Sequence, residues 1–81
     1  MTYITTFYSH FGAIRYKKSC GEQNIPARIM PVPRDLSSSC GTCVASEGSY
    51  LLPEGQALEE IEQIVEKTDA GYQEIYRAAD S

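Results

Sequence analysis

The stretch PEGQALEEIEQIVEKT, residues 53–68, decides the fold class expected for this chain. Its apolar positions recur every three or four residues and form one stripe, as in an amphipathic helix. These positions are Ala57, Leu58, Ile61, Ile64, Val65 and Thr68. Pro53 suits the first position of a helix, and Glu54 and Glu59 suit its positive N-terminal end. The pattern therefore predicts a helix over residues 53–68, and its acidic side is interpreted as a solvated face.

The segments around this stretch predict four strands and one more helix. The expected strands are rich in aromatic and β-branched residues or lie between turn signals, and they cover residues 3–8, 27–32, 42–46 and 72–76. A helix is expected over residues 10–23, with Ser9 as its N-cap. Its buried stripe would be Ala13, Tyr16 and Cys20, which are spaced three and four apart.

The resulting order, βαββαβ, predicts a single α+β domain over residues 1–81 with a frayed tail at 76–81. The compact solution is the ferredoxin-like plan, a four-stranded antiparallel sheet with both helices on one face. Right-handed crossovers place the third strand beside the first. The strand over residues 27–32 should lie at an edge, because Pro31 and Pro33 cannot donate to a ladder. Cys40 should then lie near Ser9 and His10.

Composition excludes several classes of protein. The net charge of −4 argues against a nucleic-acid surface, which needs a basic footprint. No apolar run reaches the roughly 18 residues of a membrane span, and the start of the chain does not resemble a secretory signal. Three cysteines, an odd number, do not indicate a disulfide-stapled secreted module. We therefore expect a cytoplasmic protein with reduced thiols.

The stretch PVPRDLSSSCGTC, residues 31–43, is the candidate functional site. Two prolines rigidify its start, and Ser37, Ser38, Ser39 and Gly41 form a polar binding loop. The thiolate form of a cysteine is its nucleophile, and nearby cations and amides lower the pKa of the thiol. Arg34 and the positive end of the first helix are therefore expected to favour a sulfur anion at Cys40.

Two further residues could act with Cys40, and each has a plainer alternative. Cys43 completes a CxxC pair, and it either resolves a disulfide or packs within a strand; an extended backbone would place the two Cα atoms beyond the ~7 Å limit for a disulfide. His10, the only histidine, could be an acid or base, or simply an exposed residue of the first helical turn.

Ion pairing and metal binding leave further alternatives. Arg34 could instead pair with Asp35 or Glu47. Cys40, Cys43 and His10 supply three potential zinc ligands, but Cys20 lies at the wrong end of its helix to be the fourth. No metal or cofactor is expected within one chain, although a metal site shared between two chains stays open.

Several of these segments together resemble a known family. They are Ser9-His10 before a helix, Ile25-Pro26-Ala27-Arg28, Pro31-Val32-Pro33-Arg34 and Ser37-Ser38-Ser39-Cys40-Gly41. From about Tyr3 to Tyr76 the chain resembles the bacterial DUF3343 family of selenium/sulfur carrier-like proteins. The resemblance implies that Cys40 carries sulfur or selenium, with Gly41 beside it and Arg34 upstream, between a donor protein such as a cysteine desulfurase and an acceptor protein. Cys43 is not part of the resemblance.

Three functions follow from these observations. The first is a persulfide or perselenide carrier, which is sulfurtransferase-like rather than a stand-alone catalyst. The second is a CxxC dithiol redox protein or sensor. The third is a non-catalytic interaction module that forms a homodimer, with some of the six tyrosines lining a sheet face that no helix covers. The carrier is the preferred hypothesis.

Overall fold

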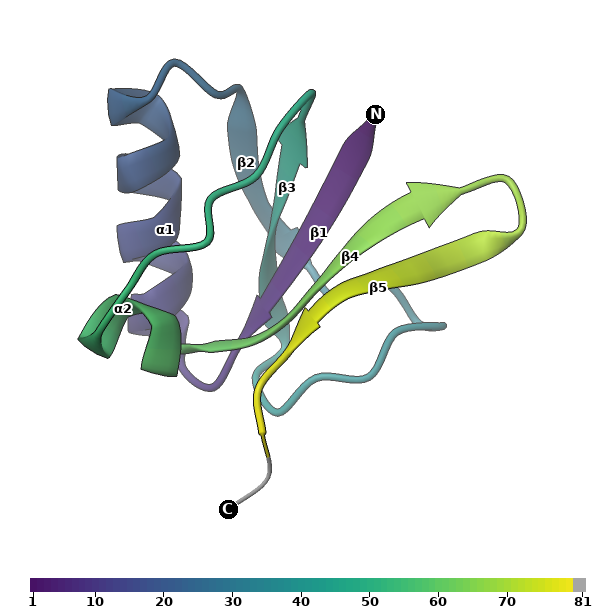
Figure 1. The fold of residues 1–81 in the computed structure, drawn as a ribbon. Helices are drawn as coiled ribbons and strands as arrows, with labels where there is room; N and C mark the ends of the chain where they lie inside the picture. Colours follow the sequence, from purple (N-terminus) through teal and green to yellow (C-terminus); the bar gives the residue numbers. More distant parts are fainter. Residues whose placement is uncertain (80–81) are drawn as a thin grey trace.

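The computed structural model describes residues 1–79, which form one sheet with two helices (Figure 1). The elements, in chain order, are β1 (Thr2–Phe7), α1 (His10–Glu22), β2 (Ala27–Pro31), β3 (Thr42–Glu47), α2 (Gln56–Glu59), β4 (Ile61–Thr68) and β5 (Gly71–Arg77). The strands are ordered β2-β3-β1-β4-β5, and all neighbours are antiparallel. The α+β class and the antiparallel sheet are therefore confirmed.

The first half of the chain folds as the sequence predicts. The side chain of Ser9 caps α1 by accepting a hydrogen bond from the backbone nitrogen of Gly12, at 3.4 Å. The expected stripe of Ala13, Tyr16 and Cys20 is buried. Asn24 follows the helix with a φ of 60°, the left-handed conformation expected of a stop residue. β2 lies at a sheet edge, and β3 lies between β2 and β1.

The second half corrects the four-stranded βαββαβ prediction, because the sheet has five strands. The expected helix over residues 53–68 is wrong: only Gln56–Glu59 is helical, and Ile61–Thr68 forms the strand β4 beside β1. The predicted last strand exists as β5, and it pairs with β4. The frayed tail is expected from residue 76, but the ordered structure extends further. Residues 76–77 belong to β5, and Ala78 donates a 3.0 Å backbone hydrogen bond to Glu62. Residues 80–81 of that tail lie outside the described residues.

A β-bulge explains why β4 has the spacing of a helix. Thr6 of β1 pairs with Gln63, and Phe7 pairs with Ile61, so that Glu62 is an extra residue. In a regular strand, residues three apart point to opposite faces. The extra residue brings Ile61 and Ile64 to the same face, where both join the core beneath α1. A spacing of three therefore arises here from a bulged strand.

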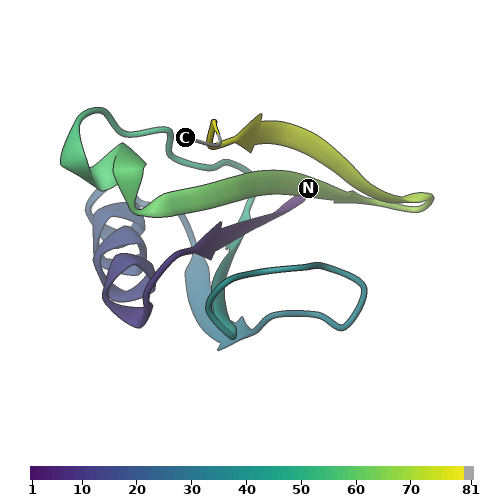
Figure 2. The same cartoon turned by 90° about the horizontal axis from the view of Figure 1, so that it is seen from below.

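The helix α1 lies on one side of the sheet and a long loop on the other (Figures 1 and 2), and each side has its own apolar core. We call the side covered by α1 the helix face; its buried residues are Phe7, Ala13, Tyr16, Cys20, Val44, Ile61 and Ile64. The opposite side, the loop face, is covered by residues 32–41, which we call the Cys40 loop. Its core consists of Ile4, Cys43, Ala45 and Val65, with Met30, Val32, Leu36 and Tyr72 packed against them.

The loop face corrects the expectation of an uncovered face lined by tyrosines. Val32 and Leu36 of the Cys40 loop pack over it, and of the six tyrosines Tyr72 alone is part of its apolar cluster. Tyr16 is buried in the helix-face core and Tyr76 packs against it, while the rings of Tyr3 and Tyr50 meet at a tilt with a separation of 4.9 Å. The argument for a tyrosine-lined dimer surface therefore does not hold.

Candidate functional site

The Cys40 loop lies at the sheet edge where β1 ends and β3 begins. Thr6 of β1 pairs with Cys43 of β3, and α1 begins three residues after β1 ends. At this edge Nδ1 of His10 lies 3.3 Å from the hydroxyl oxygen of Thr42. The predicted meeting of the start of α1 with the start of β3 is therefore confirmed, although His10 contacts Thr42 and, within residues 1–79, makes no hydrogen bond to Cys40.

The three cysteines occupy different environments, and all are free thiols. Cys20 and Cys43 are completely buried, each 0% exposed, whereas Cys40 is partly exposed on its loop. Cys20 belongs to the helix-face core, as its spacing predicts. Burial raises the pKa of the Cys20 thiol. Cys40 is therefore the cysteine that an external reactant can reach.

Cys43 is a packed strand residue of the loop face. Burial raises the pKa of its thiol to about 11, although the positive charge of Arg28 lowers it in part. Its sulfur lies 3.7 Å from the backbone oxygen of Pro31, at hydrogen-bond distance for a thiol. At neutral pH Cys43 is therefore almost entirely a protonated thiol, the form that is a poor nucleophile.

The serines order the loop around Cys40. The hydroxyl of Ser38 donates to the backbone oxygen of Cys40 at 2.7 Å and accepts from its backbone nitrogen at 3.3 Å. The backbone nitrogen of Ser39 donates to Glu62 at 3.0 Å. Because the amides of Ser39 and Cys40 have these partners, they fix the loop conformation instead of pointing freely at the sulfur.

Arg34 lies on the surface, and Gly41 lies at the end of the pairing between β2 and β3. Arg34 is exposed, and within residues 1–79 the structure shows no ion pair between it and Asp35 or Glu47. Its alternative partners are engaged elsewhere: Asp35 accepts from Tyr72 at 2.9 Å, and Glu47 accepts from Thr2 at 2.8 Å. The backbone oxygen of Gly41 accepts from Val32 at 3.1 Å, which extends the pairing of β2 with β3.

Glu62 is one of two neighbouring residues of this site, with Gln63, that the sequence analysis missed. The helical pattern predicts Glu62 on the solvated side of a helix, but it lies in the bulge of β4 and receives hydrogen bonds from Ser39. Burial alone would raise the pKa of Glu62, but the hydrogen bonds from the backbone and the hydroxyl of Ser39, with a further one from Thr6, outweigh that effect and lower it. The signal that could have found it is the β-branched content of residues 61–68 followed by a turn at residues 69–70.

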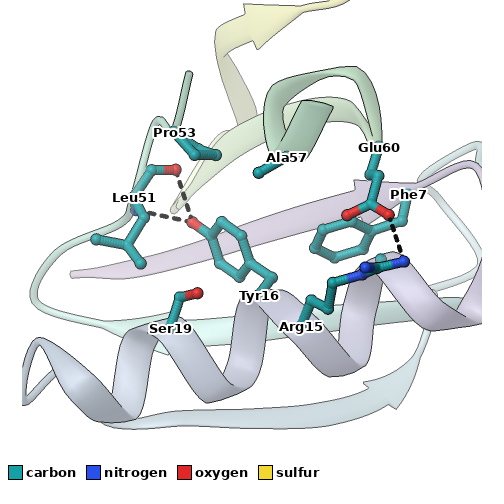
Figure 3. A pocket seen from close by; sticks show the side chains of 9 residues that line it. Phe7, Arg15, Tyr16, Ser19, Leu51, Pro53, Ala57 and Glu60 are labelled. Atoms are coloured by element: carbon teal, nitrogen blue, oxygen red, sulfur yellow. Dashed lines mark hydrogen bonds and ion pairs between the residues drawn. The ribbon is translucent and has the colours of Figure 1, made fainter. Parts of the chain in front are cut away.

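A small pocket elsewhere shows how the segment before α2 is anchored (Figure 3). It lies between α1 and residues 51–60. The hydroxyl of Tyr16 accepts from the backbone nitrogen of Leu51 at 2.8 Å and donates to its oxygen at 3.0 Å. Arg15 pairs with Glu60 at 3.0 Å. None of the predicted site residues lines this pocket, so we interpret it as a packing feature.

The described residues show neither a cluster of metal ligands nor a membrane-spanning helix. Across residues 1–79, no three or more His, Cys, Asp or Glu side chains are grouped so that they could hold a metal ion. The same part of the chain has no helix with the length and apolar character needed to cross a membrane.

Comparison with protein families finds one match that covers nearly the whole chain. Residues 2–77 match the family described as "Putative Se/S carrier protein-like". Comparisons with curated proteins and with solved structures find no match. The match includes the Cys40 loop, β4 and β5, and it agrees with the resemblance inferred from the sequence.

Proposed function

Because the chain belongs to the Se/S carrier protein-like family, we propose that it carries one sulfur or selenium atom on Cys40, as a persulfide or perselenide. The observation that carries this proposal is the difference in exposure among the cysteines. Two of the three are completely buried, and Cys40 alone is accessible. It also lies on a loop, where transfer to another protein meets the least obstruction.

The chemistry proposed for Cys40 is thiol exchange with a persulfide. The Cys40 thiolate attacks the outer sulfur of a donor persulfide, so that a new S–S bond forms on Cys40 and the donor cysteine leaves as a thiolate. An acceptor thiolate then attacks the same outer atom, and Cys40 leaves as a thiolate. Each step exchanges one S–S bond for another and needs no external oxidant. The donor and acceptor are both proteins of the cytoplasm in this proposal.

The environment of Cys43 supports the carrier over the dithiol alternative. A resolving cysteine must be available as a thiolate, and the burial that raises the pKa of Cys43 to about 11 opposes this. We assign Cys43 a packing role in the loop-face core. Arg34 and His10 remain candidates for contact with the carried sulfur or selenium or with a partner protein. Both are exposed: Arg34 lies in the Cys40 loop, and His10 lies beside Thr42 at the start of β3.

The test is to load the protein with sulfur and locate it. The protein is incubated with a cysteine desulfurase and L-cysteine, and peptides are analysed by mass spectrometry after alkylation. We expect the mass of one added sulfur on the peptide that contains Cys40. The Cys40→Ser variant should lose it, while Cys43→Ser and Cys20→Ser keep it. Label on Cys20 or Cys43 alone, or on no cysteine, would contradict the proposal.

A further inference from the structure

The bulge in β4 turns two neighbouring side chains toward the Cys40 loop. Neighbouring residues of a regular strand point to opposite faces, so only one of them could reach that loop. Because Glu62 is the extra residue opposite Thr6 and Phe7, both Glu62 and Gln63 contact it. Bulges occur preferentially beside functional sites, where they redirect a side chain.

Glu62 holds Ser39 at two points. One carboxylate oxygen accepts from the backbone nitrogen of Ser39 at 3.0 Å, and the other accepts from its hydroxyl at 2.7 Å. The hydroxyl of Thr6 also donates to this carboxylate, at 3.4 Å. Hydrogen bonds to a charged acceptor are stronger than those between neutral groups. The charge of Glu62 is thus stabilised by donors from the Cys40 loop and β1.

Gln63 holds Ser37 from beneath the loop. The Gln63 residue is only 3% exposed. Its amide nitrogen donates to the backbone oxygen of Ser37 at 2.8 Å, and its amide oxygen accepts from Arg77 of β5 at 3.0 Å. Arginine can only donate, so the amide oxygen must face Arg77 and the amide nitrogen must face the loop. The side chain therefore joins β5 to the Cys40 loop.

Ser38 transmits these contacts to Cys40. It lies between the two residues that β4 holds, and its hydroxyl bonds both backbone groups of Cys40. The backbone of Cys40 is thereby fixed relative to β4, the strand beside β1 in the middle of the sheet.

We propose that Glu62 and Gln63 are positioning residues that hold the Cys40 loop in the conformation that presents Cys40 for chalcogen transfer. The inference rests on the proposed function of Cys40 and adds to it two residues of β4 that fix the position of the Cys40 loop. A reacting group held in the productive geometry gains rate, and small displacements lose it. The two residues act through Ser37, Ser38 and Ser39, and neither touches the cargo.

The test compares Glu62→Ala and Glu62→Gln with Glu66→Gln, a matched control. Glu66 also lies in β4, and no hydrogen bond or ion pair of its side chain is recorded within residues 1–79. Hydrogen exchange is measured by mass spectrometry over residues 37–41 and over α1. Iodoacetamide alkylation of Cys40 and sulfur loading by a cysteine desulfurase are measured on the same proteins.

We expect Glu62→Ala to speed exchange over residues 37–41 about tenfold, as the loss of charged hydrogen bonds implies, with α1 unchanged. Alkylation of Cys40 should accelerate. The maximal loading rate should fall about tenfold, while the half-saturating donor concentration stays within about twofold. Glu62→Gln keeps one acceptor and should restore part of each effect, and Glu66→Gln should match the wild type.

Wild-type exchange over residues 37–41 in Glu62→Ala would overturn the inference, as would a rise spread equally over α1. If Glu62→Ala does not fold, Glu62→Gln and Ser39→Ala decide the outcome by the same criteria. If the wild type takes up no sulfur, the proposed function fails. The positioning role is then still decided by hydrogen exchange and by the alkylation rate of Cys40.

Discussion

The two faces of the sheet are closed by different forces. On the helix face, α1 packs a continuous apolar core that includes an edge contact between Phe7 and Tyr16, with a ring separation of 5.3 Å. On the loop face, the cover is a loop without regular structure, of which only Val32 and Leu36 pack against the apolar core. Polar contacts from Glu62, Gln63 and Tyr72 hold the rest of this loop. Apolar burial stabilises the whole fold, whereas these polar contacts hold a single segment, and segments with few buried apolar contacts have the lowest local stability in proteins. Cys40, the accessible cysteine, lies in the segment that these polar contacts hold.

The largest effect should follow from damage to the helix face. Phe7 is 1% exposed, and truncating a buried phenylalanine removes apolar burial and leaves a cavity. We expect Phe7→Ala to lower the free energy of unfolding by about 3–5 kcal/mol. Urea denaturation followed by circular dichroism measures it. A loss below about 1 kcal/mol would show that the helix face is not the main source of stability.

A smaller effect on stability should appear when the Glu62 carboxylate is protonated at low pH. The folded pKa of Glu62 lies below its unfolded value, so its contribution to stability is complete above the unfolded pKa of about 4.3. The contribution is lost as the pH falls through the folded pKa. The difference in urea midpoint between wild type and Glu62→Gln should therefore shrink on going from about pH 7 to about pH 3.

Glu66→Gln serves as the control for this titration, since it removes a carboxylate from the same strand without a bond to the Cys40 loop. Its difference from the wild type should change little over the same interval. A Glu62→Gln difference that is equal at both ends of the interval would contradict the assigned role of the carboxylate.

The smallest effect on stability should come from loss of the hydrogen bond between Tyr72 of β5 and Asp35 of the Cys40 loop. Tyr72→Phe removes the 2.9 Å hydrogen bond to Asp35 and keeps the ring in the loop-face core. An exposed hydrogen bond of this kind contributes about 1 kcal/mol or less. We expect faster hydrogen exchange near residues 33–37 and almost no change in the urea midpoint. A large drop in that midpoint would mean that the two faces unfold as one unit.

The sequence was sufficient for the half of the fold in which local signals agree with the final packing. Ser9 caps α1, Asn24 follows its end, and Pro31 lies in the edge strand β2, each as local chemistry predicts. The neighbourhood of β1, β3 and the start of α1 followed from the handedness of crossovers.

The second half could not be predicted by periodicity, because a bulged strand and a helix share the same spacing. Ile61 and Ile64 lie on one face only because Glu62 is inserted between paired positions. Residues 63–65 are all buried, since both faces of the sheet are covered, so β4 also lacks the alternation of a half-exposed strand. Of the candidate site, the sequence predicted Cys40 and the serines but not Glu62 and Gln63, whose contacts with the Cys40 loop depend on that insertion.

The burial of Cys20 and Cys43 has a consequence for stoichiometry. Under the proposed function, a chain with two buried thiols and one accessible thiol would carry a single sulfur or selenium atom at a time. The quantity moved in a given time would then depend on how many copies are present and how often each returns to its donor. Carrying more sulfur or selenium at once would require more molecules, since Cys20 and Cys43 are completely buried.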